Sequence, residues 1–190
     1  MNFSAVILAG GKSSRMGRDK AWLEVGGQPL LARQIQLARE LGAREIFISG
    51  RADADYAAFG YPVLRDKFAG AGPLAGIERA LDAAALPLLL VLAVDLPEMS
   101  VEFLRGLGAG CVENVGAIPR VNGNIEPLAA FYPKAAQSLA GASLGNRRNA
   151  VTTFAENCAQ SGLARFVELP AAEARHFVNW NSPADLPCLT

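Results

Sequence analysis

Short apolar runs alternate with amphipathic stretches along the whole chain, and this alternation predicts the fold class. Runs rich in Val, Ile, Leu and Phe predict strands at residues 4–9, 45–49, 61–64, 88–94 and 164–169. Stretches with helical periodicity predict helices at residues 29–41, 73–85, 101–107, 134–140 and 147–160, with a short helix after residue 182. Strands that alternate with helices in this way predict an α/β fold, in which a doubly wound, mostly parallel sheet has helices on both faces.

Single residues sharpen these boundaries. Gly42 is typical of the C-terminal cap of the first helix, Pro73 of the first turn of the second, and Ser100 of the N-cap of the third. The unbroken Leu/Val run over residues 88–94 indicates a central parallel strand that is covered on both faces.

The texture of the sequence changes after residue 116. The pair Asn122-Gly123 predicts a tight turn, and the flanking runs at 117–120 and 127–132 would then form a small β-hairpin insertion. The chain shows neither a linker nor an internal repeat, and 190 residues suffice for one full hydrophobic core. We therefore expect a single domain over residues 1–190.

Composition and charge exclude several classes of function. Lys plus Arg equals Asp plus Glu at 18 each, so the net charge favours neither a nucleic-acid nor a membrane partner. A secretory signal layout is absent, and the longest apolar run is short and interrupted by Pro87. His176 is the only histidine, which argues against a histidine triad or a multi-histidine metal site. The three cysteines form no C-x-x-C pair, and we expect reduced thiols without a catalytic role: Cys111, Cys158 and Cys188. These features predict a soluble, cytoplasmic protein.

Candidate chemistry is concentrated in residues 8–20, where the first strand breaks into Leu-Ala-Gly-Gly-Lys-Ser-Ser-Arg-Met-Gly-Arg-Asp-Lys. Glycines allow backbone N–H groups to close on phosphate oxygens. Lys12, Arg15 and Lys20 add the fixed positive charge that a nucleoside triphosphate requires. The segment therefore predicts a polyanion cradle, with an ordinary glycine-rich turn and solvated cations as the alternative.

Two familiar phosphate-binding motifs do not match this segment. The P-loop requires a glycine at the position of Val6. The dinucleotide pattern G-x-G-x-x-G fails because Gly10 and Gly11 are adjacent and the next glycine is Gly17.

Two carboxylates follow predicted strands. Asp66 comes after residues 61–64, and Asp95 comes after residues 88–94. The carboxyl ends of parallel strands meet at one edge of the sheet, so we expect both near the polyanion cradle. A carboxylate in apolar surroundings is costly unless it meets a cation, and Mg²⁺ held by one carboxylate with phosphates and water would suit Asp95. The alternatives are that Asp95 caps the following segment and that Asp66 lies in an ordinary loop.

The sequence closely resembles the molybdenum cofactor guanylyltransferases of the nucleotidyltransferase superfamily. Residues 8–20 resemble their signature loop. Four further segments are similar to motifs of this family, in the same order: Gly-Pro-Leu-Ala-Gly-Ile at 72–77, Val-Asp-Leu-Pro at 94–97, Pro-Leu-Ala-Ala-Phe-Tyr at 127–132 and Asn-Trp-Asn-Ser-Pro-Ala-Asp-Leu at 179–186. The resemblance covers nearly the whole chain, from Ala5 to Leu186, and implies the Rossmann-like fold of nucleotidyltransferases.

The resemblance implies a Mg²⁺-dependent enzyme that transfers GMP from GTP to the terminal phosphate of molybdenum-bearing molybdopterin and releases pyrophosphate. It implies that the nucleotide is bound by Leu8, Ala9, Gly10, Gly11, Lys20, Asp66 and Asp95. Catalysis would rest on Arg15, Lys20 and Asp95, of which Asp95 binds the metal. Molybdopterin would be bound by Arg147, Arg148, Asn179 and Asn181. The implied protein partners are transient ones, molybdenum-insertion proteins and molybdoenzyme chaperones.

The implied reaction needs little acid–base chemistry. The acceptor phosphate is already anionic, so no general base is required, which agrees with a chain that holds one histidine. Charge neutralisation and positioning dominate phosphoryl chemistry, and Arg15, Lys20 and a metal ion on Asp95 would screen the two anions from each other.

Two departures from the family pattern limit what can be carried over. Family members often have asparagines where this chain reads Ile-Ser-Gly-Arg at 48–51. Trp180 stands where a smaller aliphatic residue is usual, either for core packing or as part of an altered pterin wall.

Three other functions remain open on the sequence. They are a cytidylyltransferase of the same cofactor, a sugar-phosphate nucleotidyltransferase, and a non-catalytic nucleotide-binding partner in molybdoenzyme assembly. The similar cytidylyltransferases typically read Leu-Ala-Ala-Gly in the first loop. Gly10 removes a side chain there and leaves room for a purine, so we expect a preference for GTP.

Overall fold

The computed structural model describes residues 1–10, 19–51, 54–112 and 114–180. An eight-stranded sheet forms its centre, in the order β10-β7-β9-β6-β1-β4-β5, with β8 paired to β7. These strands are β1 (Phe3–Leu8), β4 (Glu45–Ser49), β5 (Val63–Leu64), β6 (Leu88–Ala93), β7 (Gly116–Val121), β8 (Asn124–Ile125), β9 (Ala129–Pro133) and β10 (Ala164–Leu169). A separate two-stranded sheet consists of β2 (Glu24–Val25) and β3 (Gln28–Pro29).

Five α-helices and four short 3₁₀ helices are found in the described residues. The α-helices are α1 (Leu30–Leu41), α2 (Pro73–Ala83), α3 (Val101–Ala109), α4 (Gln137–Gly145) and α5 (Val151–Gln160). The 3₁₀ helices are η1 (Lys20–Trp22), η2 (Ala57–Phe59), η3 (Lys134–Ala136) and η4 (Ala171–Phe177). No helix in the described part of the chain is both long and apolar enough for a membrane crossing.

The sheet is mixed but mostly parallel, as the alternation of strands and helices predicts. β1 pairs in parallel with β4 and β6, β4 with β5, and β7 with β10. β9 is antiparallel to both β6 and β7. The chain runs from β1 outward to β4 and β5 and then returns to β6 on the other side of β1. Such a reversal of strand order opens a crevice at the carboxyl ends of the two strands.

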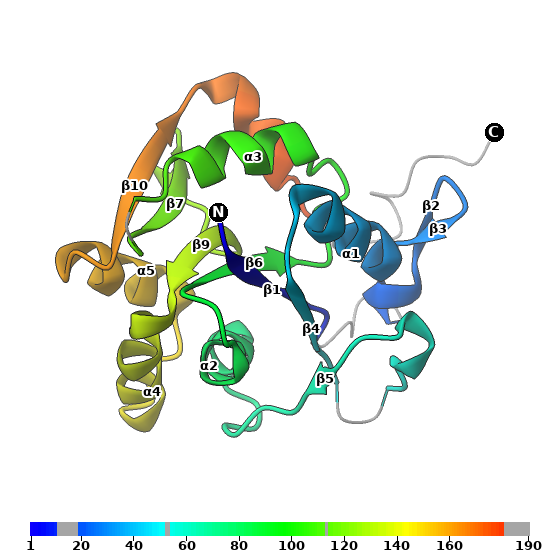
Figure 1. The fold of residues 1–190 in the computed structure, drawn as a ribbon, viewed down its shortest axis with the longest axis horizontal. Helices are drawn as coiled ribbons and strands as arrows, with labels where there is room; N and C mark the ends of the chain where they lie inside the picture. Colours follow the sequence, from blue (N-terminus) through cyan, green and yellow to red (C-terminus); the bar gives the residue numbers. More distant parts are fainter. Residues whose placement is uncertain (11–18, 52–53, 113, 181–190) are drawn as a thin grey trace.

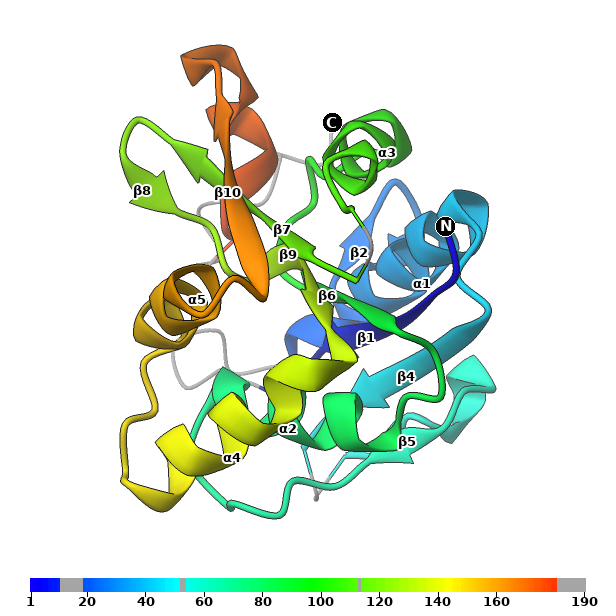
Figure 2. The ribbon, with the colours of Figure 1, turned by 60° about the vertical axis from the view of Figure 1, so that its left-hand side comes forward.

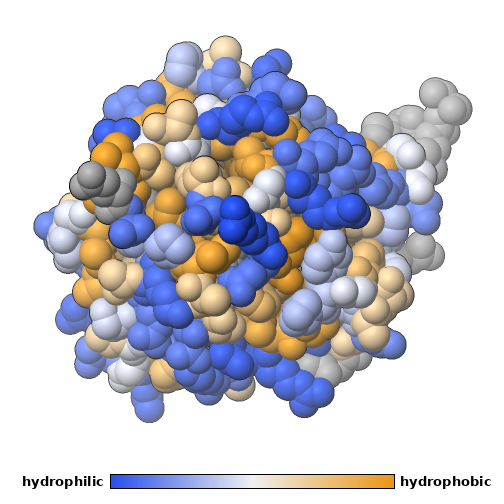
Figure 3. Space-filling model, in the orientation of Figure 1, coloured by the Kyte–Doolittle hydropathy of each residue, from blue (hydrophilic) through white to orange (hydrophobic). Residues whose placement is uncertain are grey.

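Helices cover both faces of the sheet. Figure 1 shows α1 and α3 on one side of the strands and α2 and α4 on the other, and Figure 2 shows α5 beside α4. Adjacent residues of β1 pack into opposite layers, Ile7 with α1 and α3 and Val6 with α2, α4 and α5. All of β6 is buried, which explains its unbroken Leu/Val run. Figure 3 shows mainly hydrophilic residues over the helices and loops, with apolar residues visible between them.

The predicted caps are present. Gly42 ends α1 with φ of 94°, in the left-handed region that glycine adopts without a steric penalty. Ser100 Oγ accepts a hydrogen bond from Phe103 N at 3.2 Å, and Pro73 lies in the first turn of α2.

The predicted hairpin is present at its turn but differs in its second arm. Asn122 and Gly123 have positive φ and connect β7 to β8, which has only two residues. The run predicted as the second arm forms β9, which lies between β6 and β7. All five residues of β9 are buried, and a fully apolar strand is stabilised more by insertion into the sheet than by an exposed hairpin. The helix predicted after residue 182 lies outside the described residues.

Candidate functional site

A cleft opens at the carboxyl ends of β1, β4 and β6. Its walls come from strand ends, η1, the start of α2 and the segment before β9: Leu8, Ala9, Gly10, Lys20, Ser49, Asp66, Gly72, Pro73, Ala93, Val94, Asp95 and Leu128. Six of the seven residues predicted to bind the nucleotide are among them: Leu8, Ala9, Gly10, Lys20, Asp66 and Asp95. The seventh, Gly11, and the predicted catalytic Arg15 lie outside the described residues.

The end of β1 is fixed by backbone hydrogen bonds. Ala9 N and Gly10 N both donate to Ser49 O, at 2.8 and 3.1 Å. A Cβ atom added to Gly10 would lie 3.5 Å from Gly50 C, which is an ordinary van der Waals contact. The protein around Gly10 therefore does not require a glycine, and its missing side chain leaves space in the cleft.

A lysine and an aspartate meet in this cleft. Lys20 Nζ lies 2.8 Å from Asp95 Oδ2, and both side chains are largely buried. Lys20 begins η1, whereas Asp95 directly follows the buried strand β6 and its extension at Val94. A cation thus faces a carboxylate where a polyanion would have to bind.

Lys20 is held in place by residues that the sequence did not point to. Asp19 caps η1 through Oδ1, which accepts from Ala21 N at 3.0 Å, and its Oδ2 accepts from the Tyr56 hydroxyl at 2.7 Å. Burial and this hydrogen bond raise the pKa of Tyr56, so the hydroxyl stays protonated and acts as the hydrogen-bond donor. Position 50 requires a glycine, because a Cβ atom there would lie 2.2 Å from the Tyr56 ring. The only sequence signal was an aspartate placed just before Lys20, the position of a helix cap.

Asp66 lines the same cleft and is exposed to solvent, so it belongs to the rim of the cleft. Partial burial raises the pKa of this carboxyl and the like charge of Glu78 adds to the rise, whereas a hydrogen bond from Ser49 lowers it. The carboxylate therefore gains from any cation that enters the cleft.

The amino end of α2 also reaches the cleft. Gly72, with φ of 76°, turns the chain into Pro73, and both residues line the cleft. Gly76 allows α2 to approach β4, since a Cβ on it would lie 2.3 Å from Ser49 Oγ. The N–H groups and dipole of a helix amino end favour negative charge. The cleft thus combines Lys20 and this helix end, which attract anions, with two carboxylates that attract a cation.

A second pocket lies next to the cleft, and Leu128 lines both. Its other lining residues are mostly apolar: Leu96, Glu126, Pro127, Ala129, Val151, Thr152, Phe177 and Asn179. Burial raises the pKa of Glu126. Of the four residues predicted to bind the acceptor, Asn179 lies in this pocket and Asn181 falls outside the described residues. Arg147 and Arg148 are exposed on the connection between α4 and α5 and line neither pocket.

The two described cysteines are not among the residues that line the cleft. Cys111 and Cys158 are free thiols whose burial raises their pKa to about 11 and about 12, so both stay protonated and poorly nucleophilic. Cys188 lies outside the described residues. Trp180 is buried, which favours core packing over a role in a pterin wall.

The carboxylates of the cleft form a donor set that is compatible with Mg²⁺. Among the described residues, no three His, Cys, Asp or Glu side chains are grouped so that they could hold a metal ion. Mg²⁺ commonly takes one or two carboxylates, with substrate phosphates and water as its other ligands. Asp95 and Asp66, on the walls of one cleft, offer that limited set.

Comparisons with known proteins show to which family the chain belongs. A family model described as "MobA-like NTP transferase domain" matches residues 5–161. A protein of Opitutus terrae named "Probable molybdenum cofactor guanylyltransferase" is 38% identical over 96% of this chain and 92% of its own length. A protein of the same name from Carboxydothermus hydrogenoformans is 35% identical over 97% of this chain and 93% of its own.

A solved structure shares the fold. It is that of a nucleotidyl transferase from Methanothermobacter, with a TM-score of 0.78 and 20% identity over 97% of this chain and 94% of that one. At that level of identity the similarity supports the nucleotidyltransferase architecture alone.

Proposed function

The chain belongs to the family of MobA-like NTP transferase domains, and on that premise we propose that it is a molybdenum cofactor guanylyltransferase. The enzyme transfers GMP from GTP to the terminal phosphate of molybdenum-bearing molybdopterin and releases pyrophosphate. The names of the relatives that match over nearly the whole chain support this reaction. The cytoplasm is the proposed place of the reaction, with molybdenum-insertion proteins and molybdoenzyme chaperones as transient partners.

The observation that carries the proposal is the meeting of Lys20 and Asp95 at 2.8 Å inside the cleft. Lys20 and the amino end of α2 would bind the triphosphate of GTP, and the backbone of residues 8–10 would lie against the nucleotide. Asp95 would hold Mg²⁺ together with phosphate oxygens and water, and the ion would neutralise charge on the phosphates. Because Lys20 already neutralises Asp95 Oδ2, the ammonium group must share or leave this carboxylate when the metal ion binds.

The reaction proposed here is a displacement at phosphorus. An oxygen of the acceptor phosphate attacks the α-phosphorus of GTP, and a new P–O bond forms. The bond from that phosphorus to the bridging oxygen breaks, and its electron pair leaves with pyrophosphate. No proton has to be removed from the acceptor. Lys20 and Arg15 would stabilise the negative charge that develops on the phosphates.

The acceptor would occupy the second pocket. Its apolar walls suit a flat heterocycle, and Asn179 offers an amide that can both donate and accept hydrogen bonds. The shared residue Leu128 brings the two pockets together, as transfer between two bound substrates requires.

Pyrophosphate release tests this proposal directly. The purified protein is supplied with molybdopterin and Mg²⁺ and with GTP, CTP or ATP, and GTP should give the fastest release. Asp95→Asn should lower the rate by roughly 10²-fold or more, because it removes the anionic metal ligand and leaves the shape of the side chain. Asp82→Asn is the matched control, since Asp82 is an exposed aspartate that pairs with Lys67 and Arg79 on the surface. Faster release with CTP would contradict the guanylyl assignment, and full activity of Asp95→Asn would contradict the metal assignment.

A further inference from the structure

The loop that carries Asp95 is held by its backbone from outside. We define this Asp95 loop as residues 95–99, between β6 and α3. Four successive carbonyl oxygens of the loop, those of Asp95, Leu96, Pro97 and Glu98, have a nitrogen partner far away in the sequence. The partners are Trp180 N at 3.1 Å, Gln34 Nε2 at 2.7 Å, Arg33 Nε at 3.2 Å and His176 Nδ1 at 2.7 Å.

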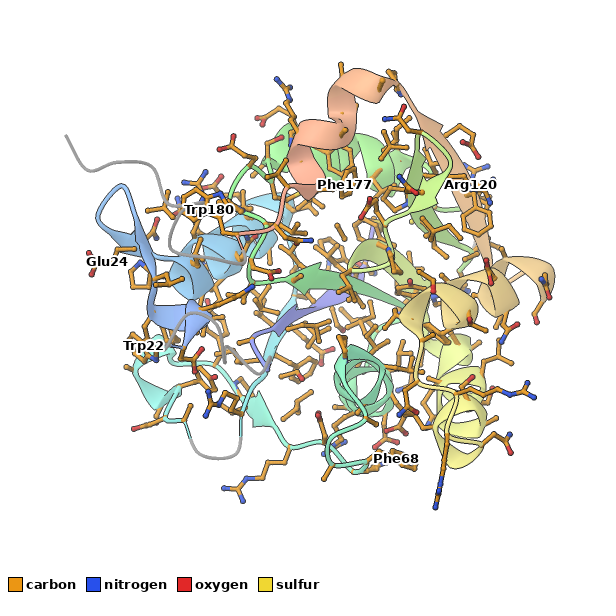
Figure 4. The ribbon with its side chains drawn as sticks, turned by 180° about the vertical axis from the view of Figure 1, so that it is seen from behind. Trp22, Glu24, Phe68, Arg120, Phe177 and Trp180 are labelled. Carbon is orange, nitrogen blue, oxygen red and sulfur yellow. The ribbon has the colours of Figure 1, made fainter. Side chains whose placement is uncertain are left out.

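These donors come from two segments on either side of the loop. Arg33 and Gln34 belong to α1, whereas His176 and Trp180 belong to the C-terminal segment over residues 171–180. Figure 4 shows Phe177 and Trp180 along this segment, and the Phe177 ring packs edge-on against Phe103 of α3. The Asp95 loop is therefore clamped between a helix and the end of the described chain.

Gln34 is the most informative member of the clamp. Its side chain is fully buried, and its Oε1 atom has no hydrogen-bond partner within the part of the chain that the structure describes. A buried acceptor without a partner lowers stability, and a leucine of similar volume would avoid that cost. Core packing therefore does not explain a glutamine at this position. The hydrogen bond from Gln34 to Leu96 O, one residue after Asp95, explains the glutamine.

His176 holds the other end of the loop. A carbonyl oxygen can only accept, so Nδ1 of His176 donates its hydrogen to Glu98 O. The ring is fixed by two further contacts, Nε2 at 3.1 Å from Glu173 Oε2 and the ring of Phe103 at 4.6 Å between centroids. His176 bonds to the backbone of the loop and lines neither pocket, so its role there is to position and not to touch substrate.

We propose that Gln34 and His176 are positioning residues for Asp95. They fix the backbone of the Asp95 loop, so that the carboxylate faces Lys20 and the cleft before any ligand binds. The inference rests on the proposed function, which gives Asp95 its task. A displacement of a reacting group by about 1 Å can cost roughly 10²-fold in rate, so a ligand on a loop benefits from such rigid support.

The clamp also joins the two pockets. Asn179, in the second pocket, is the neighbour of Trp180, whose N–H bonds to Asp95 O. The segment that lines the proposed acceptor pocket is thus the segment that holds the proposed metal ligand.

Gln34→Leu tests the inference, with Gln36→Leu as its control. Gln36 lies on the same helix, but its amide is exposed and bonds to the side chains of Gln28 and Glu40. We expect Gln34→Leu to lower kcat by about 10- to 100-fold and to raise the Mg²⁺ concentration for half-maximal rate. Its melting temperature should stay close to that of the native protein, because the lost bond to Leu96 O is offset by removal of the unpaired buried oxygen, and Leu96 O still accepts from Met99 N at 3.2 Å. A merely structural glutamine would show the opposite combination, with lower stability and unchanged kcat.

A second readout does not depend on turnover. Hydrogen exchange of the backbone amides in residues 95–99 is measured in the nucleotide-free protein, for Gln34→Leu, Gln36→Leu and His176→Phe. The phenylalanine keeps the ring contact with Phe103 but removes the donor to Glu98 O. Exchange should be several-fold faster in Gln34→Leu and His176→Phe than in the control. If exchange and kcat of both variants equal those of the native protein, the positioning role is refuted. If instead the native protein releases no pyrophosphate from GTP, the proposed function fails, and the exchange rates still decide on the clamp.

Discussion

The cleft and the second pocket are neighbours, yet they are built in different ways. Strand ends and the helix start that follows them supply most of the cleft, and the order of the parallel strands decides where these meet. The second pocket takes its walls from the approach to β9, the start of α5 and the C-terminal segment. All described residues predicted for the nucleotide converge on the cleft, whereas Asn179 is the one described acceptor residue that reaches the second pocket. The location of a site at a sheet edge can be predicted from the pattern of strands in the sequence, whereas the location of a pocket between loops cannot.

The largest effect that sharpens this comparison is expected at Lys20. Lys20→Ala should lower kcat by roughly 10²-fold, because it removes a fixed positive charge beside the reacting phosphates and unpairs Asp95. Lys67→Ala is the control, since this exposed lysine pairs with Asp82 outside the cleft. Steady-state pyrophosphate release gives kcat and KM separately. A raised KM for GTP with an unchanged kcat would mean that Lys20 only binds the ground state.

The proximity of Lys20 and Asp95 could be predicted from the sequence. Lys20 lies 75 residues from Asp95, yet both were expected at one sheet edge because each follows the end of a parallel strand. The run over residues 88–94 was equally readable, because a central strand buries both faces. The hydrogen bonds from Tyr56 to Asp19 and from Gln34 to Leu96 could not be predicted from the sequence. Buried polar pairs between distant segments leave no periodicity, and they depend on how loops pack after the sheet has formed.

The second pocket is tested by its own asparagine. Asn179→Ala should raise the KM for molybdopterin about tenfold, the value of roughly one hydrogen bond, and leave the affinity for GTP unchanged. Arg148→Ala should have a smaller effect, because that side chain is exposed on the connection between α4 and α5. Asn124→Ala, at an exposed position of β8, serves as the control. Calorimetry with GTP separates the two pockets, and a loss of GTP affinity in Asn179→Ala would contradict their division of labour.

The smallest effect concerns the rim of the cleft and depends on pH. The folded protein raises the pKa of Asp66 above its usual value of 3.8, through partial burial and the like charge of Glu78. The ionised carboxylate is therefore less favourable in the folded than in the unfolded chain, and the free energy of unfolding falls as pH rises through the raised pKa. Asp66→Asn should be slightly more stable than the native protein at pH 7, by less than about 1 kcal/mol because the side chain is solvent-exposed.

The sign of the stability change on Asp→Asn substitution distinguishes a carboxylate without a cationic partner from one that already has such a partner. The stability gain of Asp66→Asn should shrink as pH falls towards the ordinary value of 3.8 and vanish below it, as Asp66 becomes protonated in both the folded and the unfolded states. Asp82 provides the opposite case, because its hydrogen bond with Lys67 lowers the pKa of its carboxyl. Asp82→Asn should accordingly be slightly less stable than the native protein at neutral pH, and this loss should vanish as pH falls through the lowered pKa. Urea unfolding of both variants at pH 7 measures the two differences, and a series at successively lower pH follows the loss of each. If both substitutions change the free energy of unfolding in the same direction, the cleft does not disfavour the ionised form of Asp66. Asp66 would then gain no more from a bound cation than an aspartate on the surface.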